Sequence, residues 1–406
     1  MYYYRLLQNR LSSEISKNKI RLIFGARQTG KTYLLNHLLS SKKTVIYNLQ
    51  DSALRHRLEM EPGRFTRELK ALPHYIVNIF VDEIQKIPSL LDEVQFLYDK
   101  DKSRFQFYLT GSSARKLRTH SANLLPGRSH LYHLYPVISL EENNSISRLS
   151  GIDTFQKETL FPVRSLEKRL IYGNLPGIRE EKTETAVATL EAYVINYIEE
   201  EIRSEMLIKD LGAFHVFLQL AASESINQIN LSKLSQESGI PVSTVKNYYQ
   251  VLADTFVGYW LQPYRKLSRK RLLTTPEFLF FDTGVCNAAA RFNIQSSLLN
   301  EIGGRLFENA VGIELIHRAA TLGQHFSVSF WRTVSGTEVD FIWETPNEDI
   351  PIEVKWTQSP SSKHAKNVEK FIDIHHERCS RGFVVCRIKQ AQQLSERVTA
   401  IPFFEL

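Results

Sequence analysis

The sequence contains few cysteines, and none of them is spaced to bind a metal. Its 406 residues include 3 cysteines, Cys286, Cys379 and Cys386, and no CxxC pair. A disulfide framework requires an even set of cysteines, and a cysteine-rich zinc site requires closely spaced pairs. The 12 histidines are also scattered, apart from the neighbours His375 and His376. We therefore expect no disulfide framework, no cysteine- or histidine-based metal centre, and a reducing, cytoplasmic location.

Long apolar runs are missing as well. No segment approaches the roughly 20 consecutive apolar residues that are needed to cross a bilayer. The N-terminal stretch MYYYRLLQNR lacks the apolar core of a secretory signal. The sequence also has no internal repeat and no low-complexity tract. These absences predict a soluble, globular protein without a membrane partner.

The sequence does contain an excess of positive charge and enough apolar residues for sizeable cores. Lys and Arg number 51 against 44 Asp and Glu, the net charge is +7, and 43% of the residues are hydrophobic. Because single cores seldom grow beyond about 250–300 residues, a chain of this length is expected to form several domains. The moderate basicity favours a polyanionic partner, and nucleic acid is the first candidate.

The stretch GARQTGKT, residues 25–32, directly follows the mostly apolar run 20–24 and precedes an apolar-rich helical pattern. Gly25 and Gly30 allow backbone N–H groups to converge on an anion, and the helix that follows adds its positive dipole end. This order predicts a phosphate-binding loop between a buried strand and a helix. The alternative is an ordinary glycine-containing turn.

Each polar residue of this loop has an expected role. Lys31 would contact the β- and γ-phosphates of a nucleotide, and the Thr32 hydroxyl would hold a Mg²⁺ ion between them. The expected nucleotide-binding residues are Gly25, Ala26, Arg27, Gln28, Thr29, Gly30, Lys31, Thr32 and Tyr33.

A second motif, YIVNIFVDEIQK, ends an apolar strand in two acids, Asp82 and Glu83. Ligands of open α/β folds bind at the carboxyl edge of the sheet, where these acids would lie. This is a Walker B pattern, in which Asp82 would hold Mg²⁺ through water and Glu83 would act as general base on the attacking water. Alternatively, the pair would be helix N-terminal acids stabilised by the dipole.

A third strand, RFQFYLTGSSARKL, becomes small and polar at its end. Ser112 or Ser113 would sense the nucleotide there, unless the segment is a plain Ser-Gly turn, and Arg115 is a nearby cation. Further on, Arg128 follows a Pro-Gly turn. It is either an arginine finger that reaches the nucleotide of a neighbouring subunit or an ordinary surface arginine.

The alternation of strand and helix predicts an α/β fold with a parallel sheet. The motifs GARQTGKT, FVDEIQK, LTGSSARKL, PGR…YPVISLEE and YGNLPGI resemble a widespread prokaryotic AAA-type P-loop ATPase family with a C-terminal domain of unknown function. This resemblance, which covers nearly the whole chain, implies an ASCE-class P-loop NTPase core followed by a helical lid. The chain departs from it at Pro126, where the family more often has a small residue.

The middle of the chain changes to short helical patterns. FHVFLQLAAS, NLSKLSQESG and IPVSTVKNYYQVLAD have the order and lengths of a winged helix-turn-helix, with Gly239 in the turn and Pro241 opening the last helix. Such a module contacts DNA or packs between domains. The residues expected to project from its recognition helix are Ser243, Thr244, Lys246, Asn247 and Tyr248, and the expected phosphate contacts are Arg265, Lys266, Arg269, Lys270 and Arg271.

The C-terminal part carries a D…ExK pattern. Asp340 lies on one predicted strand and Glu353 and Lys355 on another, where side-chain alternation puts the last two on one face. This is the PD-(D/E)xK nuclease signature. Asp340 and Glu353 would hold Mg²⁺, Lys355 would orient or deprotonate water, Glu308 would complete the metal shell, and Glu338 is a reserve ligand. The alternative is a solvated strand face.

The sequence thus predicts a P-loop core over residues 1–170, a helical lid over 171–212, a winged helix over 213–275 and a restriction-endonuclease-like α/β domain over 276–406. It predicts a Mg²⁺-dependent ATPase that acts on DNA. The rival is an ATP-controlled switch or scaffold whose nuclease-like domain is inactive and binds DNA or protein. A homo-oligomer is expected only if Arg128 serves as a finger, and RNA remains an alternative to DNA.

Overall fold

The computed structural model describes residues 2–13, 18–39, 43–113, 125–143, 147–149, 159–198, 210–225, 227–264, 275–323 and 325–406. The chain divides into two compact units. The first consists of Met1–Tyr135, Glu201–Leu207 and Asp254–Phe256, and the second of Pro136–Glu200, Ile208–Ala253 and Val257–Leu406. Each unit is described by itself below.

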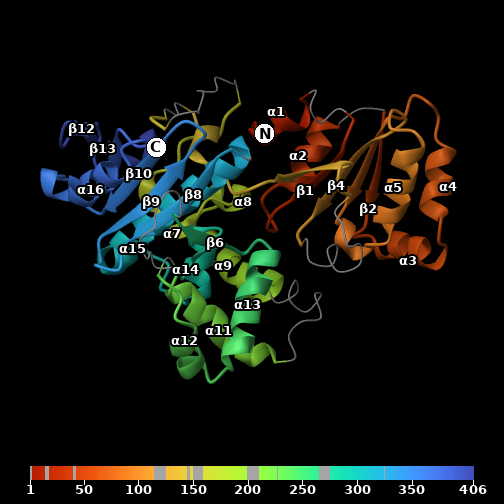
Figure 1. The fold of residues 1–406 in the computed structure, drawn as a ribbon. Helices are drawn as coiled ribbons and strands as arrows, with labels where there is room; N and C mark the ends of the chain where they lie inside the picture. Colours follow the sequence, from red (N-terminus) through yellow and green to blue (C-terminus); the bar gives the residue numbers. More distant parts are fainter. Residues whose placement is uncertain are drawn as a thin grey trace. The chain divides into compact units, whose positions relative to one another are not determined.

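A five-stranded parallel sheet forms the centre of the first unit (Figure 1). Its strands are β1 (Ile20–Phe24), β2 (Thr44–Asn48), β3 (Asn78–Asp82), β4 (Gln106–Gly111) and β5 (Ser129–His133), and their order in the sheet is β2-β3-β4-β1-β5. β1, β3 and β4 are nearly continuous apolar runs because both faces of a parallel sheet are covered. The prediction of a parallel α/β sheet is confirmed.

Helices cover both faces of this sheet. They are α1 (Leu7–Leu11), α2 (Lys31–Leu38), α3 (Ser52–Met60), α4 (Arg64–Lys70) and α5 (Leu90–Lys100). Figure 1 shows α2 on one side of the sheet and α4 and α5 on the other. Leu7 and Leu11 of α1 are buried in one apolar cluster with Ile23 of β1. The N-terminal segment thus packs its short helix against the sheet.

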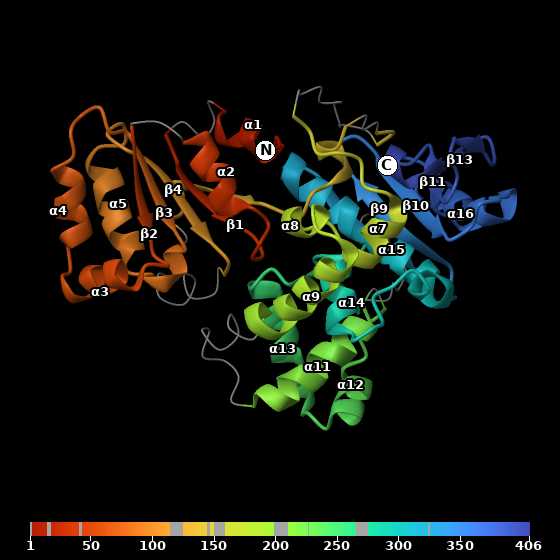
Figure 2. The same ribbon diagram turned by 180° about the vertical axis from the view of Figure 1, so that it is seen from behind.

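The second unit contains an eight-stranded sheet of order β12-β13-β11-β10-β9-β8-β6-β7. Its strands are β6 (Gly258–Pro263), β7 (Glu277–Phe280), β8 (Ser327–Arg332), β9 (Glu338–Glu344), β10 (Asp349–Lys355), β11 (Gly382–Cys386), β12 (Gln392–Gln393) and β13 (Val398–Pro402). One apolar cluster lies between the sheet and α15 (Leu298–Leu322), and a second lies between the sheet and α16 (Lys366–Ile374). Figure 2 shows these helices beside the sheet.

The remaining regular elements of the second unit are mostly short helices. They are η3 (Ser139–Glu141), α7 (Leu166–Tyr172), α8 (Pro176–Arg179), α9 (Thr183–Ala192), η4 (Tyr193–Ile198), α11 (Leu211–Ser223), α12 (Leu231–Ser238), α13 (Val242–Asp254), α14 (Thr283–Ala289), η5 (Ser362–Ala365) and η6 (Phe403–Glu405). Local capping fixes the middle group: the side chains of Asp210 and Asn230 accept backbone N–H groups of α11 and α12, and Gly239 ends α12 in the left-handed region.

One expected surface residue of this helical group is buried. Ser243, Lys246 and Asn247 are exposed on α13, but Tyr248 is only 6% exposed and its ring lies 5.2 Å from that of Phe214. The prediction that Tyr248 projects was wrong, because the aromatic ring gains more from the apolar core of the three helices than from water. The expected basic cluster 265–271 lies outside the described residues. None of the described helices is both long and apolar enough to cross a membrane.

Candidate functional site

The loop Gly25–Thr32 connects β1 to α2, and two glycines determine its path. Gly25 has φ +154°, and a Cβ atom there would lie 2.2 Å from the carbonyl oxygen of Leu134. Gly30 has φ +95° and is the N-cap of α2. Because L-residues rarely adopt these angles, both positions require glycine. The non-glycine residue Gln28 also lies in the left-handed region, at φ 62°.

The Lys31 ammonium is buried inside this loop. Its Nζ donates to the carbonyl oxygens of Gly25 at 2.8 Å and Ala26 at 2.9 Å. The Thr29 hydroxyl also donates to the Ala26 carbonyl, at 2.9 Å. The backbone thus encloses the Lys31 ammonium next to the start of α2. A phosphate bound there would meet both this cation and the positive end of the helix dipole. Of the other predicted loop residues, Arg27 is half-buried and Tyr33 is exposed.

Thr32, in the first turn of α2, contacts Asp82 at the end of β3. The Thr32 hydroxyl donates to Asp82 at 2.9 and 3.1 Å, and the Thr110 hydroxyl donates to the same carboxylate. Burial raises the pKa of Asp82, and the hydrogen bonds from Thr110 and Thr32 oppose that rise. A hydroxyl and a carboxylate are the oxygen donors that Mg²⁺ uses in nucleotide sites, so these residues fit the ion.

Glu83 lies directly after the strand that carries Asp82, in a strained backbone conformation. Its φ of 59° and ψ of 49° are in the left-handed region, which a glutamate adopts only when its surroundings enforce it. The Ser112 hydroxyl donates to Glu83 Oε2 at 3.1 Å. Because β4 lies between β1 and β3, the end of β4 brings Ser112 to the carboxylate between the two motifs.

Gln85 is a residue of this site that the sequence analysis missed. It lies in η2 (Ile84–Lys86), is 6% exposed, and its Nε2 donates to Glu83 Oε2 and, at 2.9 Å, to Ser112 Oγ. The amide therefore holds the carboxylate and the hydroxyl in one orientation. No sequence pattern distinguishes it, apart from its position two residues after Glu83.

Arg128 lies far from the loop of its own chain. Its carbonyl accepts the N–H of Ile20 at the start of β1, whereas the loop follows the end of that strand. Five residues of strand separate the two ends by about 16 Å. The Arg128 guanidinium pairs with Asp99 of α5 at 2.7 Å, and both side chains are partly exposed. The structure therefore separates Arg128 from the loop Gly25–Thr32 of its own chain, whereas Ser112 contacts Glu83.

The second predicted site lies in the second unit, on α15, β9 and β10. Asp340 Oδ2 accepts the backbone N–H of Val354 at 2.7 Å, and Lys355 Nζ lies 2.6 Å from Glu353 Oε1. The Glu353 side chain is 5% exposed, and its Oε2 has no hydrogen-bond partner among the described residues. The predicted common face of Glu353 and Lys355 is thus present as an ion pair. Glu308 lies on α15 and Glu338 on β9, where it pairs with Arg332.

Several carboxyl groups in this region disfavour ionisation. Burial and the charge of Asp340 raise the pKa of Glu308 to about 9 and that of Glu353 to about 8. Burial would lower the pKa of Lys355, but the carboxylates of Asp340 and Glu353 outweigh this effect and raise it. Burial and Asp340 also raise the pKa of Glu277, at the start of β7, to about 8. The sequence analysis missed Glu277 because it had no motif to mark it.

The predicted metal-binding role of this site is not preformed. Within the described parts of the chain, no three His, Cys, Asp or Glu side chains are grouped so that they could hold a metal ion. Asp340 is engaged by the Val354 N–H and Glu353 by Lys355. The oxygen donors have the chemistry that Mg²⁺ prefers, but their arrangement does not fit the ion without rearrangement.

An arginine is stacked on a tryptophan directly after the ends of β10 and β11. Lys355 pairs with Cys386 in the register of β10 and β11, and the next residues along are Trp356 and Arg387. The Arg387 guanidinium carbon is 3.9 Å from the centre of the Trp356 ring. The indole packs against α15 at Gly303, where a Cβ atom would come within 2.7 Å of it. The tryptophan, one residue beyond Lys355 along the chain, thus holds the Arg387 cation.

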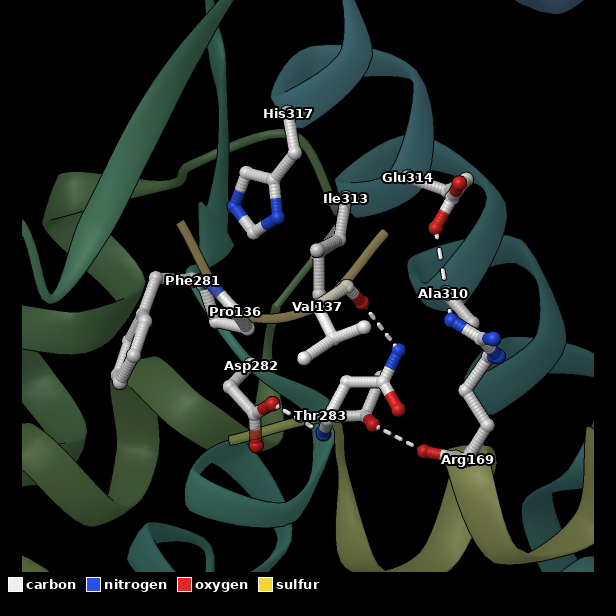
Figure 3. Close-up of a pocket in the computed structure, with 11 residues that line it drawn as sticks. Pro136, Val137, Arg169, Phe281, Asp282, Thr283, Ala310, Ile313, Glu314 and His317 are labelled. Carbon is white, nitrogen blue, oxygen red and sulfur yellow. Dashed lines mark hydrogen bonds and ion pairs between the residues drawn. The ribbon is translucent and has the colours of Figure 1, made fainter. Parts of the chain in front are cut away.

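Figure 3 shows a small cavity elsewhere in the second unit, between α7, α14 and α15. Its volume of about 20 Å³ is room for a single water molecule. Several of its polar groups pair with one another: Arg169 Nη1 lies 3.5 Å from Glu314 Oε2, and the Thr283 hydroxyl donates to the Arg169 carbonyl at 2.6 Å. This cavity is a small packing void between helices, and it has no room for a substrate.

Comparison with known protein families assigns the three main segments. Residues 17–142 match an AAA domain, residues 163–296 match a domain of unknown function designated DUF8612, and residues 303–406 match another, DUF4143. The first match agrees with the loop and sheet described above. Residues 17–142 are therefore similar to AAA domains. The AAA part of the resemblance is confirmed, as is a C-terminal domain of unknown function, while the winged-helix and nuclease-like parts stay predictions.

Similar proteins extend along most of the chain. An uncharacterized protein of Methanocaldococcus jannaschii is 23% identical over 385 residues, which cover 91% of this chain and 82% of that protein. An uncharacterized protein of Mycobacterium tuberculosis is 21% identical over 394 residues, which cover 97% and 82%. Among solved structures, a Walker-type ATPase of Pyrococcus abyssi matches with 14% identity and a TM-score of 0.46, over 71% of this chain and 96% of that one.

Proposed function

We propose that the AAA domain binds ATP and hydrolyses it in a Mg²⁺-dependent reaction. The observation that carries the proposal is the meeting of three groups at the carboxyl ends of adjacent strands. These are the enclosed Lys31 ammonium, the Thr32–Asp82 pair, and Glu83 with Ser112 at its carboxylate. Such an edge is where open α/β sheets bind ligands.

Each group has a distinct part in the proposed reaction. Lys31 exchanges its two carbonyl partners for phosphate oxygens, and Thr32 and Asp82 provide the oxygen donors for the ion. Mg²⁺, when bound, neutralises charge that develops on the β- and γ-phosphate oxygens. Glu83 orients the attacking water and accepts its proton, while Ser112 and Gln85 hold that carboxylate in place.

Phosphate release from MgATP tests this proposal. The wild type should release phosphate steadily, and Lys31→Ala should lose both nucleotide binding and hydrolysis. Lys100→Ala, which removes an exposed lysine at the end of α5, is the matched control and should retain both. An inactive wild type in the presence of Mg²⁺ and ATP would contradict the proposal.

We further infer that the second unit acts on DNA through a PD-(D/E)xK nuclease-like site formed by Glu308, Asp340, Glu353 and Lys355. The observation that favours it is the buried Glu353 carboxylate, whose Oε2 has no partner among the described residues while Lys355 engages Oε1. A metal ion or a water molecule would complete that oxygen's coordination. The order α15-β8-β9-β10-α16-β11 also supports the assignment.

End-labelled single- and double-stranded DNA distinguishes a nuclease from the rival switch. Cleavage is measured with Mg²⁺ or Mn²⁺, with and without ATP, for the wild type, Lys355→Ala and Lys31→Ala. Cleavage that is lost in Lys355→Ala identifies the nuclease, and the Lys31→Ala result tells whether ATP controls it. ATP hydrolysis without cleavage would contradict the nuclease and leave a switch or scaffold whose second unit binds DNA or protein.

The remaining assignments belong to the same proposal. The segments 171–212, 213–275 and 276–406 are proposed as lid, winged helix and nuclease-like domain, and Arg128 as a finger acting in a homo-oligomer. Exposed Ser243, Lys246 and Asn247 on α13 are compatible with DNA contact. RNA and protein are the alternative partners.

A further inference from the structure

Arg5 is a buried arginine that binds the back of the phosphate loop. It precedes α1 and is 5% exposed. Its Nη1 donates to the Thr29 carbonyl at 3.0 Å, and its Nη2 donates to the Tyr135 carbonyl at 2.6 Å. One guanidinium therefore joins three separate parts of the first unit: the N-terminal segment, the loop and the residue that follows β5.

The bond to Thr29 determines the orientation of one peptide unit of the loop. In a trans peptide the C=O and N–H groups point in opposite directions. Holding the Thr29 carbonyl towards Arg5 therefore directs the N–H of Gly30 away from Arg5. Gly30 is the N-cap of α2 and has φ +95°. Because glycine has no side chain, its own structure restrains the orientation of this peptide only weakly. Such N–H groups are the donors with which a phosphate loop binds its ligand.

The hydrogen bond from Arg5 to the Tyr135 carbonyl connects the loop to the segment that follows β5. Leu134, the preceding residue, donates its N–H to the Phe24 carbonyl at 2.8 Å, and its own carbonyl lies against Gly25. Residues 134 and 135 thus support the beginning of the loop directly and its end through Arg5. Hydrogen bonds from a charged donor are stronger than neutral ones, so Arg5 is the strongest of these supports.

We propose that Arg5 is a positioning residue for the nucleotide, which keeps the Thr29–Gly30 peptide oriented to bind phosphate. The proposal rests on the ATP binding proposed above. Arg5 touches only backbone of the loop, and its loss leaves Glu83, Ser112 and Gln85 in contact with one another. Its removal therefore weakens ATP binding much more than it slows the hydrolysis of bound ATP.

Arg21 provides a matched control in the same unit. It is 3% exposed, donates through Nε to the Leu11 carbonyl at 3.1 Å, and stacks on the Tyr108 ring at 4.6 Å. Like Arg5, it ties the N-terminal segment to the sheet through backbone carbonyl groups. Its side chain donates to the Leu11 and Lys19 carbonyls and, within the described parts of the chain, to no residue of the loop. Arg21→Ala thus removes a similar side chain and a similar tether without altering the loop.

The test measures KM for ATP and kcat in the full-length protein, with the ATP-induced shift in melting temperature as an independent readout of binding. Arg5→Ala should raise KM by about tenfold, the loss expected for a hydrogen bond from a charged donor. Its kcat should stay within about threefold of the wild-type value. Arg5→Lys should recover part of the affinity because an ammonium can reach one of the two carbonyls. Arg21→Ala should leave KM unchanged even if it lowers the melting temperature of the free protein.

Three results would overturn the proposal. One is an unchanged KM in Arg5→Ala, another is an equal rise of KM in Arg21→Ala, and the third is a kcat that falls as far as affinity does. If Arg5→Ala does not fold, Arg5→Lys decides alone, and a wild-type KM in that variant overturns the proposal. A wild type that shows no ATP-induced shift and no hydrolysis overturns the proposed function itself, which is a distinguishable failure.

Discussion

The Thr32 hydroxyl donates a hydrogen bond of 2.9 Å to Asp82, which is 50 residues away in the sequence. Thr32 belongs to the first turn of α2 and Asp82 to the end of β3, and β4 lies between β3 and the strand that leads into α2. This contact makes one site out of two separate motifs. It also places a hydroxyl and a carboxylate where both can bind one cation.

We predict that Thr32→Ala increases the Mg²⁺ concentration needed for half-maximal ATP hydrolysis. The change removes one oxygen donor and leaves the Thr110 hydroxyl as the remaining donor to the Asp82 carboxylate among the described residues. Thr32→Ser, which keeps the oxygen, is the control. A Mg²⁺ titration of phosphate release measures the effect, and identical titration curves for the wild type and Thr32→Ala would contradict it.

Glu83→Gln should slow hydrolysis by a factor of about 10²–10⁴, the usual contribution of a general base, while ATP binding persists. Gln85→Ala should give a smaller loss because it removes the amide that holds the Glu83 carboxylate beside Ser112. Single-turnover hydrolysis and equilibrium binding of a fluorescent ATP analogue separate the two effects. Wild-type turnover in Glu83→Gln would refute the role of the carboxylate as a base.

Arg128 yields a prediction about assembly, because it lies at the end of the sheet opposite to its own loop. If it serves a neighbour, Lys31→Ala and Arg128→Ala chains should each be inactive alone and recover activity when mixed. The Asp99→Ala variant, which releases Arg128 from its ion pair, should remain active. Hydrolysis per chain is measured across a dilution series. Full activity of Arg128→Ala at every concentration would make Arg128 an ordinary surface residue.

The stability of the second unit should depend on the protonation of Glu277. Its ordinary pKa of 4.5 rises to about 8 in the folded chain, so the folded state holds a proton that the unfolded state releases at neutral pH. The stabilisation by the neutral acid is complete below the ordinary pKa and is lost as pH rises through about 8. Glu277→Gln is neutral at all pH values and should be more stable than the wild type above that pH.

Chemical denaturation at about pH 5 and about pH 9 measures this difference. The stability gain of Glu277→Gln should be large at the higher pH and small at the lower one. Glu301→Gln, which alters an exposed glutamate of α15, should follow the wild type at both. Parallel pH profiles of Glu277→Gln and the wild type would show that the folded state does not retain the proton.

DNA binding by the second unit should depend on Arg387. Because Trp356 holds this guanidinium directly after the end of β10, Arg387→Ala should weaken binding to all sequences and reduce the slope of log affinity against log salt by about 1. The matched control is Arg381→Ala, at the opposite end of β11, where the side chain pairs with Glu348. Equal salt slopes for Arg387→Ala and the wild type would exclude a phosphate contact at this residue.

The sequence predicted those parts of the sites that depend on local patterns. The loop glycines follow from backbone sterics, and the shared face of Glu353 and Lys355 follows from strand alternation. The parallel sheet followed from the alternation of strands and helices. Each of these depends on residues that are close together in the chain.

Contacts between distant segments could not be predicted in this way. Arg5 reaches Thr29 and Tyr135 only after the sheet has formed, and Glu277 approaches Asp340 through the order of strands in a second sheet. Tyr248 was misplaced because an aromatic residue at a recognition-helix position fits both a DNA contact and a core, and only the packing of α11 against α13 decides between them.

The two carbonyl bonds of Lys31 have a consequence for how a nucleotide enters. In this conformation the loop competes with a nucleotide for Lys31. The ammonium already donates hydrogen bonds to the Gly25 and Ala26 carbonyl oxygens, and a phosphate would have to replace them. Nucleotide binding is therefore an exchange in which phosphate oxygens replace the two carbonyl oxygens at Lys31. Small anions with few other contacts gain little from that exchange, whereas a triphosphate that also engages α2 and Thr32 gains enough to displace the carbonyls.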